Sequence, residues 1–269
     1  MQPHAHHPTG SSFFDWIPIL IVVGIALVYV YARLLNNKKS KGSNWSLGRS
    51  ISFLLGISLL CIALTPTITT WGHADLRGHM VQHLLIGMFA PIFLVLGAPI
   101  TLALKVAPVK VARTVTAIFK TPLFRILSHP FIALLLNMGG MYILYLTPLY
   151  NQMLSKPYLH AVMHIHFLMA GYLFTWSIIG SDPVPYRSSF TTRKFILFIS
   201  IASHAFLSKF MYAYLYPQSS PHAAEQIQEA AKLMYYWGDL SELLLTILLF
   251  TSWYQSRHPF PAKLTPITP

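Results

Sequence analysis

The sequence places two histidines four residues apart, His79 and His83, where a long apolar stretch begins. Residues at this spacing lie on one face of a helix, and Met80 falls within the same arc. Two imidazoles and a thioether on one face form a possible ligand group for a soft metal ion. Polar side chains are also common at the ends of membrane helices, so this pair alone leaves both interpretations open.

A second group repeats the pattern in a later apolar stretch. His160 and His164 are again four residues apart, with Met163 on the same face. Phe167 and Gly171 continue that face, and the glycine would allow a neighbouring helix to approach closely. We interpret His166, which points elsewhere, as a packing or interfacial histidine.

Ionisable residues also lie deeper in two apolar stretches near the C-terminus. His204 shares a face with Met211, and Asp239 shares a face with Glu242. Such groups cost about 2.5–3.5 kcal/mol each to insert into a membrane, so they usually face the interior of a bundle and have a function. The alternative is that His204 and Asp239 pair to lock two helices together.

Together these groups predict a metal site in the outer half of a membrane protein. Imidazole and thioether ligands without thiolate pairs favour copper, particularly Cu(I). Asp239 and Glu242 would lie behind the ligands and accept hydrogen bonds from ring N–H groups, or would attract the cation. The predicted metal ligands are His79, His83, His160, His164, Met80, Met163, His204 and Met211.

A zinc protease and a haem protein would also use histidines as ligands. A zinc protease is excluded because the general base of H-E-x-x-H is missing between His79 and His83. Haem binding through His83, His164 and His204 stays an alternative, since histidine is a common axial ligand. Methionines accompany the outer histidines, and this favours copper.

The composition places the chain in the membrane class. Of 269 residues, 54% are hydrophobic and only 10% are charged. Nineteen Lys and Arg residues outnumber seven Asp and Glu residues. The basic residues lie in short loops between apolar stretches, which indicates membrane topology and argues against nucleic-acid binding. The single cysteine, Cys61, excludes an intramolecular disulfide and a Cys-rich metal site.

The apolar stretches predict an all-α bundle with seven transmembrane helices, because each is about long enough for a hydrocarbon core of about 30 Å. The predicted spans are Ile17–Leu35, Ile51–Thr70, His79–Leu104, Pro130–Thr147, Leu159–Ile179, Phe195–Tyr216 and Leu233–Tyr254. They form one domain, residues 17–254. The loop Val106–Ser128 could hold an amphipathic helix on the membrane surface.

The basic residues predict an N-out, C-in orientation. Fifteen of the nineteen fall in the loops that would be cytoplasmic, whereas three, Arg77, Lys156 and Lys232, fall outside. Because no Lys or Arg precedes the first span, we do not expect it to be a cleaved signal peptide. Residues 1–16 would be an extracellular tail and residues 255–269 a cytoplasmic tail. His4, His6 and His7 in the first tail could collect metal weakly.

The motifs resemble those of a known family. These are His79-Met80-Val81-Gln82-His83-Leu84-Leu85 with Gly97-Ala98-Pro99, His160-x-x-x-His164, and Tyr235-Tyr236-Trp237-Gly238-Asp239-Leu240-x-Glu242. In order and setting they resemble the caa3-type cytochrome c oxidase assembly factor family, CtaG. The resemblance implies a multi-pass protein of the bacterial plasma membrane that is not an enzyme and helps to mature a haem-copper oxidase, with oxidase subunits and membrane lipid as partners. The residues that match the family's motifs are the site candidates that the resemblance implies: His79, His83, His160, His164, Asp239 and Glu242. The prediction of Met80, Met163, His204 and Met211 as ligands depends only on their positions on helical faces.

Two functions of other classes compete with assembly. A copper transporter would need a polar path to the cytoplasmic side, and beyond Cys61 and Thr246 the sequence offers little of one. A haem-binding redox protein is the other alternative, and the colour of the purified protein would identify it.

Overall fold

The computed structural model describes residues 13–39, 44–183 and 186–258, and every regular element in these ranges is helical. The elements before residue 107 are η1 (Phe13–Trp16), α1 (Ile17–Lys39), α2 (Leu47–Ala63), α3 (Pro66–Ala74), α4 (Leu76–His83), η2 (Leu84–Phe89, a π-helix), α5 (Ala90–Leu96) and α6 (Pro99–Val106). The later elements are α7 (Val109–Phe119), α8 (Pro122–Leu127), α9 (Pro130–Leu146), α10 (Leu149–Ser155), α11 (Pro157–Ile179), α12 (Phe190–Tyr214) and α13 (Ala224–Arg257). The N-terminal histidines His4, His6 and His7 and the tail after His258 lie outside the described residues.

Five helical segments are long and apolar enough to cross a membrane. They are α1, the continuous segment α4–η2–α5, α11, α12 and α13. Two bent pairs also pass if each counts as one span: α2 with α3, bent by 54°, and α9 with α10, bent by 78°. The protein is therefore a helical membrane protein with five to seven candidate spans. Seven spans and the N-out orientation stay predictions.

Prolines explain both bends. Pro66 is the first residue of α3 and has no N–H with which to continue the hydrogen-bond ladder of α2. Pro148 stands between α9 and α10 in the same way. The second and fourth predicted spans are thus each two helices that meet at an angle.

The prediction that the third span reaches Leu104 is wrong. The straight segment ends at Leu96, because Ala98 has a left-handed backbone (φ 48°) and Pro99 starts a new helix, α6. The turn is held in place by the Tyr29 hydroxyl, which donates to the Gly97 carbonyl over 2.8 Å. The Asp182 carboxylate accepts from the first free N–H groups of α6, including that of Thr101 over 2.7 Å.

The start of the seventh predicted span is displaced by a similar amount. α13 begins at Ala224, nine residues before the predicted seventh span, and is 34 residues long. The segment predicted to hold one amphipathic helix contains two short ones, α7 and α8, and neither has a buried residue.

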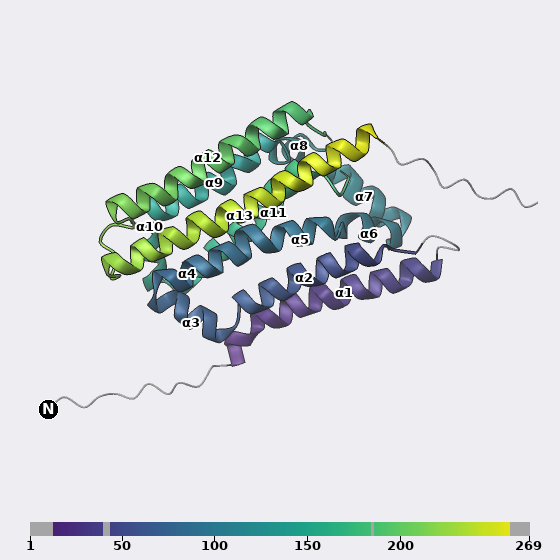
Figure 1. Ribbon diagram of the computed structural model, residues 1–269. Helices are drawn as coiled ribbons and strands as arrows, with labels where there is room; N and C mark the ends of the chain where they lie inside the picture. Colours follow the sequence, from purple (N-terminus) through teal and green to yellow (C-terminus); the bar gives the residue numbers. More distant parts are fainter. Residues whose placement is uncertain (1–12, 40–43, 184–185, 259–269) are drawn as a thin grey trace, which may run out of the picture.

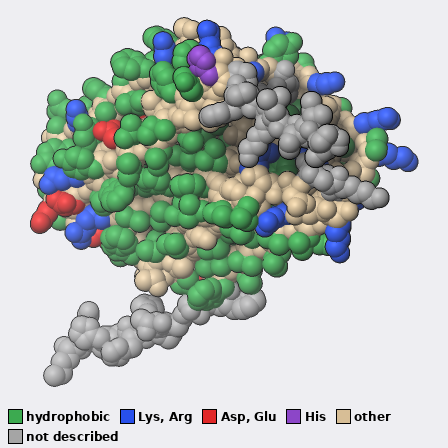
Figure 2. Space-filling view, turned by 45° about the vertical axis from the view of Figure 1, so that its right-hand side comes forward, with side chains coloured by type: hydrophobic (Ala, Val, Ile, Leu, Met, Phe, Trp, Pro, Cys, Tyr) green, Lys and Arg blue, Asp and Glu red, His purple; other side chains and the backbone are tan. Residues whose placement is uncertain are grey.

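The long helices lie side by side, as Figure 1 shows. The segment α4–η2–α5 packs against α11 and α13. On one side of it, α2 packs against α5 and α1 packs against α6. On the other side, α9 and α12 pack against each other and against α11 and α13. α3 and α10 cap one end of the bundle, which we call the histidine end because α4 and α11 begin there; α6, α7 and α8 lie at the opposite end. On the face of the molecule that Figure 2 shows, hydrophobic side chains cover most of the middle.

Candidate metal centre

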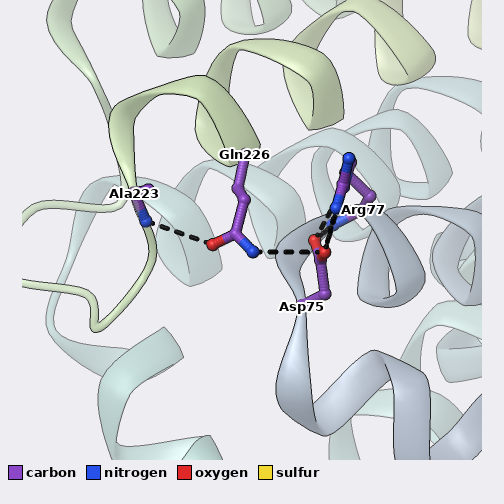
Figure 3. Close-up of polar contacts among 4 residues, drawn as sticks. All are labelled: Asp75, Arg77, Ala223 and Gln226. Atoms are coloured by element: carbon purple, nitrogen blue, oxygen red, sulfur yellow. Dashed lines mark hydrogen bonds and ion pairs between the residues drawn. The ribbon is translucent and has the colours of Figure 1, made fainter.

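The start of α4 is fixed by a polar network at the histidine end. Asp75 caps α4 by accepting from the backbone N–H of Arg77 over 2.8 Å, and the Arg77 guanidinium also binds its carboxylate. These hydrogen bonds hold the pKa of the Asp75 carboxyl below its usual value. Gln226 at the start of α13 donates to Asp75 over 3.2 Å and accepts from the N–H of Ala223 (Figure 3). The network therefore sets the position of α4 relative to α13.

α3 folds back over α4 because polar and small residues meet there. The helix break at Pro66 leaves the Ala63 carbonyl free, and the Gln82 side chain donates to it over 2.8 Å. A Cβ at Gly78 would lie only 2.7 Å from Trp71 of α3, so a larger residue would push the two helices apart. This packing brings His73 of α3 to the outer histidines.

α11 approaches the α4–η2–α5 segment closely through two glycines. A Cβ at Gly171 would overlap the carbonyl group of Gly87, which is backbone and cannot rotate away. The π-helical turn η2 follows directly after His83, and such turns are frequent at functional sites. The close approach brings the histidines of α11 to the side of α4 that carries His79.

Three histidines meet at this contact, and we call them the outer group: His79, His160 and His164. One ring nitrogen of each lies within 4.8 Å of those of the other two. His79 and His160 are buried. Among the described residues, both ring nitrogens of His79 and the Nε2 atoms of His160 and His164 are buried without a hydrogen-bond partner. Buried polar atoms are nearly always paired, so three neighbouring histidines that each leave a ring nitrogen without a partner are exceptional.

Aromatic rings surround the outer group. His73 stacks on His160 with ring centroids 4.2 Å apart, and Tyr150 meets His79 edge-on at 5.3 Å. A cavity of about 670 Å³ reaches His73, His160 and His164 between α11 and the pair α1 and α2. The outer group is thus enclosed by rings on one side and borders a cavity on the other.

A second group, which we call the deep group, consists of His204 from α12 and Asp239 and Glu242 from α13. One ligand atom of each lies within 4.8 Å of those of the other two. The Ser200 hydroxyl donates to Oε1 of Glu242 over 3.0 Å. Gly238 makes room for the imidazole, since a Cβ there would overlap the His204 ring. The sequence suggested one site, whereas the structure separates the carboxylates from the outer group and places them with His204.

The other predicted residues lie near these groups without joining them. The His83 ring meets Phe167 edge-on with ring centroids 4.5 Å apart, and its two ring nitrogens also have no partner among the described residues. The Met80 sulfur accepts from the Tyr145 hydroxyl at 4.0 Å. Met163 and Met211 are buried in the same apolar cluster as Met80, and their role as ligands stays a prediction.

His166 lies on the opposite side of α11 from the outer group. Its Nε2 atom is 3.1 Å from the Leu136 carbonyl of α9, and its ring packs over Gly140. This is the packing contact expected for that residue.

Three contacting side chains, His73, Tyr145 and Tyr150, were missed by sequence reasoning. His73 stands six residues before His79 on the predicted outer side, and a search of that loop for further histidines would have found it. The tyrosines carry no spacing signal, because they come from α9 and α10, on either side of the bend at Pro148.

The fold and the two groups define the class: a helical membrane protein with buried histidine nitrogens that have no partner within the described part of the chain. The chain belongs to the cytochrome c oxidase caa3 assembly factor (Caa3_CtaG) family, whose model matches residues 27–256. The family resemblance seen in the motifs is therefore confirmed.

Curated relatives are similar over part of their length. Uncharacterized protein Mb0105 of Mycobacterium bovis is 36% identical over 190 residues, which cover 68% of this chain and 29% of the relative. Uncharacterized protein ML1998 of Mycobacterium leprae is 35% identical over 193 residues, 69% of this chain and 29% of the relative. The chain thus spans less than a third of the length of these relatives. No solved structure matches the chain.

Proposed function

We propose that this protein helps to assemble a caa3-type cytochrome c oxidase by holding copper at the outer group and passing it to an oxidase subunit. The family membership supports the assembly role. The protein would act without catalysing a reaction of its own, in a bacterial plasma membrane.

The observation that carries the copper proposal is the meeting of His79, His160 and His164, whose ring nitrogens come within 4.8 Å and which each leave a buried ring nitrogen without a partner among the described residues. Neutral imidazole suits copper and zinc, and the client of the family, a haem-copper oxidase, favours copper. Bound copper would give the lone pairs of these nitrogens the partner they lack. The aromatic rings around them would keep water away from the ion, and the cavity beside His160 and His164 would be the way in or out.

Copper delivery on the outer side requires the orientation that the basic residues predict. Lys105, Lys110, Arg113, Lys120 and Arg125 lie on or beside α6, α7 and α8, at the end opposite the histidine end. By the positive-inside rule that end is cytoplasmic and the histidine end is external. Reporter fusions at Lys120 and Arg257 should read cytoplasmic, and a fusion at Ser219 should read external. A cytoplasmic signal at Ser219 would contradict delivery from the outer group.

The functional test compares histidines on one helix. Replacing His164 by Ala should abolish both the copper of the purified protein and oxidase activity in membranes, while oxidase subunits are still made and inserted. His166→Ala is the matched control, because His166 is two residues away and packs against α9. Normal oxidase activity in His164→Ala, with the variant present at the normal level, would contradict the assignment.

Haem binding is a second candidate, and one observation favours it. The cavity of about 670 Å³ beside His73, His160 and His164 is within the range of cofactor sites and has mostly apolar walls. An intense visible absorption band in the purified protein, lost in His160→Ala, would favour haem over copper.

A further inference from the structure

The geometry points to a second, separate metal site at the deep group: we propose that His204, Asp239 and Glu242 bind a divalent cation of the zinc type and not Cu(I). This inference goes beyond the copper proposal and does not depend on it.

The first argument is the set of unpaired atoms. His204 is fully buried, and neither of its ring nitrogens has a hydrogen-bond partner among the described residues. Oδ1 of Asp239 and the buried Oε2 of Glu242 also have none within the part of the chain that is described. A hydrogen bond between His204 and either carboxylate would be the simplest way to satisfy these atoms, and none is formed. The locking pair between His204 and Asp239 is therefore not what holds α12 to α13.

The second argument is spacing. The three ligand atoms lie within 4.8 Å of one another. Two ligands that bind one ion at about 2.1 Å stand at most about 4.2 Å apart, so a small rotation of the side chains would close the group around an ion. The hydrogen bond from Ser200 engages Oε1 of Glu242 and leaves Oε2 without a partner among the described residues. Gly238 leaves space for the imidazole on the same side of α13.

The third argument is charge. Two carboxylates beside a neutral imidazole would place two negative charges in a largely buried site, which is costly without compensation. The positive charge of Lys209 on α12 acts on Asp239, but its ammonium lies over the Tyr235 ring at 5.1 Å and forms no ion pair with the carboxylate. Within the described ranges, ion pairs are formed by Asp75 with Arg77 and by Glu229 with Lys232, and none by the deep group. A divalent cation would balance both charges.

The donor atoms determine which cation fits. One imidazole nitrogen and two carboxylate oxygens are ligands for Zn²⁺ and similar divalent ions, whereas Cu(I) favours imidazole and sulfur ligands over carboxylate oxygens. The outer group contains no carboxylate and the deep group contains two. The two groups therefore differ in the ion that each would select.

The experiment uses Zn²⁺ as the probe in the detergent-purified full chain. All proteins carry His164→Ala, because three histidines could also take zinc and this change disables the outer group. The test variant adds Glu242→Gln, which keeps the shape of the side chain and removes its charge. The matched control adds Glu229→Gln, a glutamate on the same helix whose side chain is 45% exposed and pairs with Lys232 away from the deep group. Each protein is dialysed against zinc, and bound zinc is measured by elemental analysis.

We expect about one zinc per chain in His164→Ala and in the Glu229→Gln control, and background zinc in the Glu242→Gln protein. Asp239→Asn serves as a second test if Glu242→Gln does not fold, and zinc should raise the melting temperature of the control but not of either carboxamide variant. Background zinc in His164→Ala, or full zinc in both carboxamide variants, would overturn the deep site.

Copper is measured in parallel under anaerobic Cu(I), so that the two proposals can fail separately. Glu242→Gln in the otherwise unchanged chain should keep its copper. Loss of copper from that variant would mean that the two groups form one shared site, which would also overturn the inference.

Discussion

α1 and the segment α4–η2–α5 are both apolar enough to span a membrane, yet they have opposite environments. Only 17% of the most apolar part of α1 is buried, against 72% for the central segment. α1 presents exposed side chains such as Leu27 and Val28 all along one face, whereas the central segment carries glycines and histidines at its contacts. Hydropathy therefore decides which helices enter the membrane, and small and polar residues decide which of them enter the middle of the bundle.

The sharpest test of this contrast is the same substitution in each helix. Leu84→Ala, where the side chain is 4% exposed, should cost about 2–5 kcal/mol because it opens a cavity in the core. Leu27→Ala, where the side chain is 66% exposed, should change stability by less than about 0.5 kcal/mol. Unfolding in detergent, followed by circular dichroism, measures both. Similar losses for the two variants would mean that α1 is as tightly packed as the central segment.

The next largest difference in stability is expected between two Gly→Ala substitutions, one in α11 and one in α1. Gly171→Ala should destabilise the bundle by about 1–3 kcal/mol, because the new methyl group overlaps the Gly87 carbonyl and forces α11 away from η2. Gly24→Ala on α1 meets nothing within 4 Å and should be neutral or slightly stabilising. Bound copper should fall with Gly171→Ala, since His160 and His164 lie on the displaced helix. Equal stability of the two variants would refute the close approach.

The smallest effect concerns the start of the central segment. Asp75→Ala removes the cap of α4 and should cost about 1 kcal/mol, whereas Asp75→Asn keeps a cap and loses only the charge. Since the pKa of Asp75 is lowered in the fold, its charge stabilises the protein above the unfolded pKa of about 3.9. That contribution disappears as the pH falls through the lower folded value.

The pH dependence of the melting temperature tests this contribution of the Asp75 charge. Melting temperatures of the native protein and Asp75→Asn should differ at neutral pH and converge in acid. A gap that stays constant down to the most acidic pH tolerated would show that the charge of Asp75 does not contribute.

Much of this architecture could be predicted from the sequence, because spacing within one helix is a local property. The shared face of His160 and His164, and that of His79 and His83, follow from positions four apart and from apolar stretches that indicate their depth. The irregular backbone could not be predicted in the same way. The apolar run continues through Ala98 into α6, so nothing in hydropathy marks the turn there.

The partition of polar residues into two groups depends on contacts between helices. Asp239 and Glu242 lie close to the outer histidines in predicted depth, but the packing of α12 on α13 pairs them with His204. His83 has the same spacing signal as His79 and lies one turn deeper, outside both groups. Sequence spacing gives a face of a helix, and only the packing shows which other face it meets.

Copper X-ray absorption of the purified full chain tests the central claim most directly. The account predicts an edge typical of Cu(I) and a first shell of imidazole nitrogens at about 2.0 Å. The Met80 sulfur is not expected in that shell, because it accepts from the Tyr145 hydroxyl. The signal should be lost in His79→Ala and kept in His166→Ala. A first shell dominated by sulfur, or the same spectrum in both variants, would contradict a copper site built from His79, His160 and His164.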